Sequence, residues 1–165
     1  MGRDLDDVDR GILYLLQREA RDTTAQEIAD TVGVSPSTIR NRIDQLEADG
    51  IIKGYHPEID YEAANLPLRI VFICTAPATE RTELATEVME LQGVIDMREM
   101  MTGRRNIHIE IVGTSTTDIT RITDAIHALG LEIESSELIR RRQIQPFNHF
   151  HFSGANSGEE AEESS

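Results

Sequence analysis

A tight turn between two capped helices constrains this chain more than any other stretch of its sequence. Thr24 and Glu27 form a capping box, in which each side chain accepts a hydrogen bond from the other residue's backbone N–H. Gly33 suits the left-handed position that ends a helix. Ser35 then caps the next helix, and Pro36 takes its first position, where no N–H is needed. The sequence therefore predicts two short helices joined by a fixed turn.

A further helix precedes this pair and completes a three-helix unit over about residues 5–54. Its apolar residues recur at i, i+4, i+7 and i+8 from Val8, with Asp6 placed as the cap and Asp9 in the first turn. The helix after the turn has a buried stripe, formed by Ile39, Ile43 and Leu46. Such a unit is a helix-turn-helix, whose second helix enters the major groove of DNA.

The side of that helix opposite the stripe carries polar groups suited to DNA. Arginine can grip guanine and asparagine adenine through two hydrogen bonds, while serine and threonine serve either. The predicted DNA-binding residues are Ser35, Ser37, Thr38, Arg40, Asn41, Arg42 and Lys53. Arg42 lies nearer the stripe and suits a phosphate contact or a structural ion pair. Lys53 follows the reading helix, at a position where a wing would approach the DNA backbone. The alternative interpretation of residues 5–50 is a helical dimerisation module whose polar face only meets solvent.

Net charge argues against nucleic acid, because DNA affinity normally rests on Lys and Arg. The chain has 30 Asp and Glu against 16 Lys and Arg, a formal charge of −14. Arg40 and Arg42 nevertheless lie in the N-terminal half of the reading helix, with the acids toward its far end. An acidic surface with one lysine is typical of proteins adapted to molar salt, as in halophilic archaea; the alternative is an acidic mesophilic protein.

The second part of the chain predicts an α+β domain. Elements are expected near residues 68–74, 79–91, 94–101, 107–111, 115–129 and 137–144, in the order β-α-β-β-α-β. That order is the ferredoxin-like, split βαβ arrangement. A short strand is also expected near Glu58–Tyr61. We expect a DNA-binding domain at 1–55, a linker at 56–67, the ferredoxin-like domain at 68–152 and a disordered acidic tail at 153–165.

Several classes of protein are excluded. No apolar run reaches the ~20 residues that span a bilayer, and the acidic N-terminus has no signal core, so a cytoplasmic protein without a membrane partner is expected. The single cysteine, Cys74, lies in an apolar strand and should be inert. No Ser/His/Asp set, phosphate-binding glycine loop or paired-carboxylate motif is present, so neither enzyme activity nor a cofactor is predicted.

The helical part resembles the Lrp/AsnC (leucine-responsive) family of transcription regulators. The matching stretches are Leu5-Asp6-Asp7-Val8-Asp9-Arg10, Val34-Ser35-Pro36-Ser37-Thr38-Ile39-Arg40 and Gly50-Ile51-Ile52-Lys53-Gly54-Tyr55. The resemblance implies a winged helix-turn-helix followed by a RAM-type ferredoxin-like domain. It also implies homodimers formed through the β-sheets, assembly into tetramers or octamers, binding to double-stranded promoter DNA, and control of amino-acid or nitrogen metabolism genes by a small effector.

The resemblance also implies an effector site at the turn before the third strand of the second domain. The candidate residues are Thr102, Gly103, Arg104, Arg105 and Asn106. The family pattern is Gly-x-x-Asp, whose carboxylate suits an ammonium group, but this chain has Asn106 there. The hypothesis for this chain is therefore an anionic ligand, a ligand with an acidic side chain, or no ligand, rather than an ordinary amino acid bound in the usual way. An exposed turn is an equally good interpretation of the two arginines.

Other interpretations stay open at this stage. Some haem-biosynthesis enzymes of the sirohaem-decarboxylase type resemble this fold, but the strand at residues 97–101 lacks the expected His or Tyr. A chromatin-organising protein would differ from a promoter-specific regulator only in the number of DNA sites that it covers. His108, His149 and His151 could suggest a metal, although surface packing is the ordinary role. The arginines at 140–142 could meet DNA or an acidic partner, or form a solvated strand edge, and the methionines at 97, 100 and 101 could fill core and interface.

Overall fold

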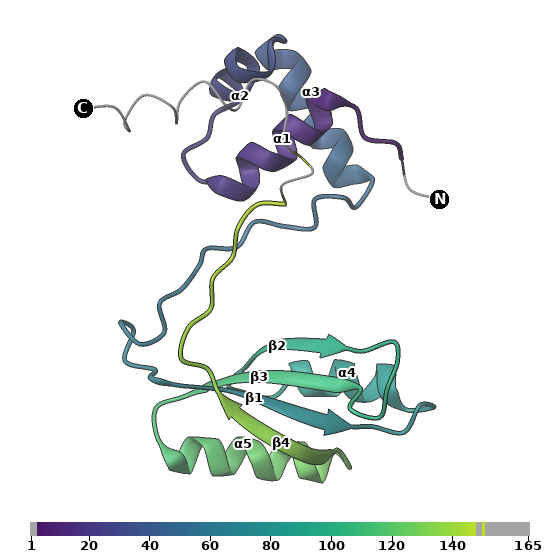
Figure 1. Ribbon diagram of the computed structural model, residues 1–165, viewed down its shortest axis with the longest axis vertical. Helices are drawn as coiled ribbons and strands as arrows, with labels where there is room; N and C mark the ends of the chain where they lie inside the picture. Colours follow the sequence, from purple (N-terminus) through teal and green to yellow (C-terminus); the bar gives the residue numbers. More distant parts are fainter. Residues whose placement is uncertain (1–2, 148–149, 151–165) are drawn as a thin grey trace, which may run out of the picture. The chain divides into compact units, whose positions relative to one another are not determined.

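The computed structural model describes residues 3–147 and residue 150, and the chain divides into two compact units. The helical unit extends to Pro57 and also takes in the return segment that begins at Gln143. The sheet unit is Glu58–Arg142. The sequence predicts that residues 143–152 belong to the second domain. The structure groups those of them that it describes with the helices (Figure 1).

The helical unit contains α1 (Asp7–Arg18), α2 (Ala25–Val32) and α3 (Pro36–Ala48) (Figure 1). The predicted caps are confirmed: Asp6 and Thr24 both form capping boxes, and Gly33 is left-handed with φ of 83°. Apolar side chains from the three helices meet in one core, whose fully buried members include Ile12, Ile28, Ile39 and Leu46. In the return segment, Phe150 packs against this core and meets the Phe147 ring edge-to-face, with ring centroids 5.0 Å apart.

No strand forms between α3 and Leu68, so the short strand expected near Glu58–Tyr61 is wrong. The chain makes a turn at residues 61–65 instead. Asp60 explains the difference, because its Oδ1 accepts from the Ala63 N–H at 2.9 Å and its carbonyl accepts from the Ala64 N–H at 3.0 Å. A short polar side chain that bonds nearby backbone favours a turn over a strand.

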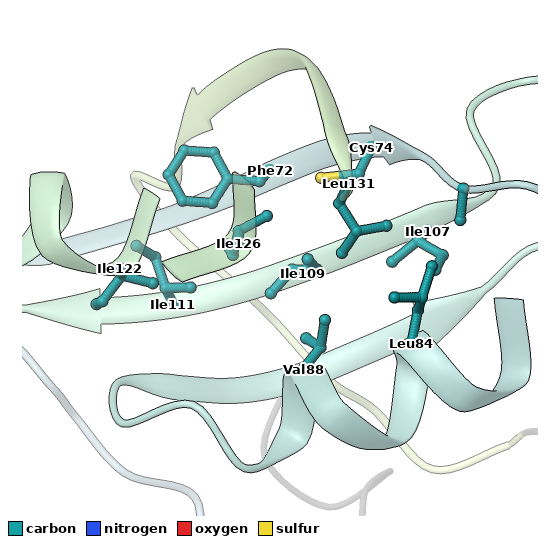
Figure 2. Packing of buried hydrophobic residues seen from close by; sticks show 11 residues of the cluster. Phe72, Cys74, Leu84, Val88, Ile107, Ile109, Ile111, Ile122, Ile126 and Leu131 are labelled. Carbon is teal, nitrogen blue, oxygen red and sulfur yellow. The ribbon is translucent and has the colours of Figure 1, made fainter. Parts of the chain in front are cut away.

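The sheet unit has the predicted order β-α-β-β-α-β. Its elements are β1 (Leu68–Thr75), α4 (Arg81–Met89), β2 (Val94–Glu99), β3 (Ile107–Gly113), α5 (Thr116–Ala128) and β4 (Glu132–Leu138). The strands lie in the order β2-β3-β1-β4 and every neighbouring pair is antiparallel. Side chains of α4 and α5 pack on one face of the sheet, against Phe72, Cys74 and the isoleucines of β3 (Figure 2).

The last strand was expected at residues 137–144 and lies earlier. Gly130, with φ of 87°, ends α5, and the chain turns back at once so that Glu132 pairs with Thr75 of β1. The apolar pattern after Leu138 was misleading, because residues 139–147 form no strand. Contrary to the prediction, Arg140, Arg141 and Arg142 therefore do not lie on a strand.

The face of the sheet away from the helices carries a charged cluster. Glu110 of β3 is only 2% exposed, and it pairs with Arg69 of β1 and with Arg98 of β2, the latter at 3.4 Å. A buried carboxylate needs such partners, since an unpaired buried charge is costly. The centre of this face is thus polar but internally satisfied.

Candidate functional site

The outward face of α3 presents the side chains that the sequence predicted. Ser37, Arg40 and Asn41 are exposed, and Thr38 is half-buried. The stripe on the opposite side is buried, since Ile39 and Leu46 have no exposed surface. The N-terminal half of α3 therefore offers hydroxyl, guanidinium and amide groups on one side of a helix whose other side is fixed in the core.

Ser35 uses its hydroxyl to build the start of this helix. Its Oγ accepts from the Thr38 N–H at 3.2 Å and lies 2.9 Å from Ser37 Oγ and 2.8 Å from Thr38 Oγ1. A hydroxyl has one donor and two acceptor positions, so these three contacts occupy it. Ser35 thus orients Ser37 and Thr38, and its hydroxyl is engaged within the helix start.

Arg42 forms the structural ion pair that was one of its two predicted roles. Its Nη1 lies 2.8 Å from an Asp6 carboxylate oxygen and 3.3 Å from Asp9 Oδ1. Arg3 reaches Asp9 from another side at 2.7 Å. Asp9 has no exposed surface, so these contacts link α1 to α3 through a buried carboxylate. The backbone N–H of Asp9, followed by the charge of Arg42, lowers the pKa of Asp6.

The segment after α3 is held against that helix and carries Lys53. Backbone N–H groups of Ile51 and Ile52 donate to the Leu46 carbonyl at 2.9 and 3.1 Å. The Tyr55 hydroxyl donates to a Glu47 carboxylate oxygen at 2.8 Å. Burial and this carboxylate raise the pKa of Tyr55 to about 12, so the phenol stays protonated. Lys53 is exposed at a position defined relative to α3.

The acids at the far end of α3 are mostly directed to partners within the chain. Glu47 accepts from Tyr55, and Asp49 pairs with Arg3 at 3.3 Å. Within residues 3–147, neither Arg40 nor Lys53 forms an ion pair. Arg40 and Lys53 are therefore the predicted DNA-binding cations whose charge is not taken up by an acid within these residues. Sequence reasoning missed the roles of Arg3 and Tyr55, because no local pattern pairs Arg3 with Asp49 or Tyr55 with Glu47.

The β2–β3 turn carries the residues predicted to form an effector site, residues 102–106. Asn106 is 6% exposed; its Oδ1 accepts from the Ala76 N–H and its Nδ2 donates to the Ala76 carbonyl, both at 2.9 Å. Its side chain therefore holds the turn to the end of β1. Arg104 pairs with Glu134 at 3.1 Å. Thr102, Gly103 and Arg105 remain exposed at the tip.

Other candidate features take structural or surface positions. Met97 packs against the core, but Met101 is 94% exposed, so core filling is wrong for that residue. Cys74 is buried, which raises the pKa of its thiol to about 12 and disfavours the reactive thiolate. No three His, Cys, Asp or Glu side chains among the described residues are grouped to hold a metal ion. His149 and His151 lie outside the described residues, as does the tail from residue 153.

No helix in the part of the chain that the structure describes has the length and apolar character to cross a membrane.

A family model described as winged helix-turn-helix DNA-binding matches residues 5–53, which contain all three helices of the helical unit. The fold and the exposed polar face of α3 thus define a DNA-binding protein of the helix-turn-helix class. This family model covers only the helical unit, and the family is defined by relatives that match along both units.

Relatives that match the chain over both the helical unit and the sheet unit are named transcriptional regulators. The chain is 32% identical over 139 residues to the HTH-type transcriptional regulator LysM of Sulfurisphaera tokodaii, which covers 84% of this chain and 96% of that protein. LysM of Saccharolobus solfataricus is 33% identical over 138 residues, or 83% and 94% of the two chains. The crystal structure of MtbAldR superposes with a TM-score of 0.72 at 25% identity over 85% of this chain and 97% of its own.

The fold is shared with regulators named for leucine. The leucine response regulatory protein LrpA of Mycobacterium tuberculosis has a TM-score of 0.74, at 21% identity over 89% of this chain and all of its own. The chain belongs to the Lrp/AsnC family of transcription regulators. It is a DNA-binding regulator and not an enzyme of the decarboxylase type.

Proposed function

We propose that this protein is a cytoplasmic, homodimeric regulator that reads a palindromic promoter site through the N-terminal half of α3. The observation that carries this proposal is the exposure of Ser37, Arg40 and Asn41 on a helix whose start is fixed by the Ser35 cap. Arginine and asparagine can each make paired hydrogen bonds to one base in the major groove. Two such helices related by a dimer axis would read two half-sites about one helical turn apart.

The remaining predicted residues take distinct roles in this proposal. Thr38 adds a hydroxyl at the groove edge, and Lys53 neutralises a backbone phosphate beside the groove. Arg42 holds α3 against α1 through Asp6 and Asp9, so its removal would misplace the reading helix rather than remove a base contact. Base contacts specify the sequence while phosphate contacts fix the register.

Dimerisation through the open face of the sheet is the arrangement we favour. That face centres on Glu110 with Arg69 and Arg98, a satisfied polar cluster that a second copy could cover without leaving a charge unpaired. Assembly of such dimers into tetramers or octamers is part of the same proposal.

A small-molecule effector that controls amino-acid or nitrogen metabolism genes is supported by what similar proteins are named for. One structural neighbour, a transcriptional regulator of Neisseria meningitidis, was solved as a complex with L-Met, at a TM-score of 0.74 and 23% identity. At the β2–β3 turn, Thr102, Gly103, Arg104 and Arg105 are all exposed. With Arg104 paired, Arg105 offers an anionic ligand one cation there.

The test is sequence-selective binding of the full-length protein to promoter fragments from its own genome, in molar KCl. The wild type should prefer some fragments, and Arg40→Ala/Asn41→Ala should lose that preference by about 100-fold, since each paired base contact contributes ~1–3 kcal/mol of discrimination. Arg21→Ala is the matched control, because Arg21 is exposed before α2 and meets only Asp22 at 3.9 Å. Equal selectivity of wild type and double variant would refute the assignment of α3.

A further inference from the structure

The return segment after β4 is attached to the helical unit by two aromatic residues. Phe150 packs against the core that the three helices form, and its ring meets the Phe147 ring edge-to-face. The Phe147 N–H donates to Gln17 Oε1 of α1 at 3.4 Å, and the Phe150 N–H donates to the Phe147 carbonyl at 3.0 Å. Packing of aromatic surface together with these hydrogen bonds holds the segment to the helical unit at a defined place.

Two connections therefore join the two units, and both leave the sheet at the same place. The start of β1 and the end of β4 are neighbours, because Ile70 pairs with Leu138. The first connection, residues 56–67, meets the helical unit beside the end of α3, where the Tyr55 hydroxyl donates to Glu47. The second connection, residues 139–146, meets it at α1 through Phe147 and Gln17.

This double attachment limits the orientations open to the helical unit. A body held by one flexible connection can turn about that connection, whereas a second connection to a different helix opposes the turning. The second connection is also short, since the chain from Leu138 to Phe147 reaches at most about 30 Å when fully extended. Fixing both of its ends closes a loop, and loop closure removes conformations that a free chain end would keep.

We propose that Phe147 and Phe150 determine the half-site spacing that a dimer reads, because their attachment limits how far each helical unit can turn. This inference rests on the proposed function, in which two α3 helices read two half-sites. Moving one half-site by one base pair rotates it about the DNA axis by about a tenth of a turn. A helical unit on a single flexible connection could follow that rotation, and a doubly attached one is opposed. The two aromatic residues thus select DNA sites without touching a base.

The test measures binding of the full-length protein to duplexes that carry two copies of one half-site. The half-site comes from the promoter fragments that the wild type prefers, and the spacing increases in steps of one base pair over one helical turn. We expect wild-type dissociation constants to differ by about 10-fold or more between the best and the worst spacing, because geometry that forbids simultaneous engagement removes avidity. Phe147→Ala/Phe150→Ala should reduce this range to about 3-fold or less and leave the affinity for a single half-site unchanged.

An insertion separates the attachment from the stability of the helical unit. About ten Gly and Ser residues placed between Ile144 and Gln145 keep both aromatic residues and lengthen the flexible connection. This variant should lose the spacing preference as the double variant does, while its unfolding temperature stays that of the wild type. Ile144→Ala is the matched control, because Ile144 is 61% exposed in the same segment, and it should keep the wild-type preference.

Amide nitrogen relaxation by NMR, without DNA, reports on the attachment itself. The Phe147 N–H of the wild type and of the insertion variant should have an order parameter of about 0.85, as in a rigid backbone. In Phe147→Ala/Phe150→Ala, the N–H of residue 147 should fall below about 0.6.

The outcomes distinguish this inference from the proposed function. Selective binding of half-sites with no spacing preference, an insertion variant as discriminating as the wild type, or a mobile Phe147 in the wild type would overturn the inference alone. A protein that selects no half-site at all would refute the proposed function and the inference together.

Discussion

Asp9 shows how much of the DNA-binding surface depends on a residue that cannot touch DNA. It has no exposed surface, it receives Arg3 at 2.7 Å and Arg42 at 3.3 Å, and its carboxylate accepts the Asp6 backbone N–H at 3.3 Å. The two arginines come from segments before α1 and on α3, so one carboxylate connects the cap of the first helix with the reading helix. A carboxylate in this position is buried only because it is paired.

Replacing Asp9 should therefore destabilise the helical unit. We expect Asp9→Ala to lower the free energy of unfolding by about 2 kcal/mol or more, because the change removes a capping bond and leaves two arginines without their buried partner. The measurement is urea unfolding followed by far-UV circular dichroism. Asp7→Ala is the control, since the Asp7 side chain is 92% exposed and meets only Arg10 at 3.5 Å. Indistinguishable midpoints for the two variants would contradict the structural role of Asp9.

At the scale of elements, local signals predicted the helices well and the edge of the sheet poorly. The caps at Asp6, Thr24 and Ser35 lie within a few residues of the groups they satisfy, so the sequence alone contains that information. The last strand does not: Glu132–Leu138 is rich in Glu and Ser and forms because β1 pairs with it. Tertiary pairing overrides weak strand propensity there.

The candidate sites likewise differ in how far local sequence signals predict them. Exposure of Arg40 and Asn41 followed from helical spacing, because the buried stripe defines the opposite face. The ion pair of Arg42 with Asp9 joins residues 33 positions apart in sequence. Such contacts depend on the fold, and neither composition nor periodicity indicates them.

The β2–β3 turn gives a prediction at this scale. Asn106→Asp should lower the free energy of unfolding by about 1–3 kcal/mol, because an aspartate cannot donate to the Ala76 carbonyl and adds a charge at a position only 6% exposed. Thermal unfolding by calorimetry measures the change, with Arg105→Gln as the control in the same turn. If Asn106→Asp is as stable as the wild type and gains ligand binding, the turn is an effector site after all.

At the scale of the whole molecule, the charge of −14 affects how the protein can bind DNA. Only Arg40 and Lys53 of the predicted DNA-binding cations are free of ion pairs within residues 3–147, so a dimer would bring about four cations to the DNA. The logarithm of the binding constant should then fall with the logarithm of salt concentration at a slope of about −4 or shallower. Lys53→Gln should make the slope shallower by about 2 for a dimer, whereas a wild-type slope steeper than about −6 would indicate cationic contacts beyond α3.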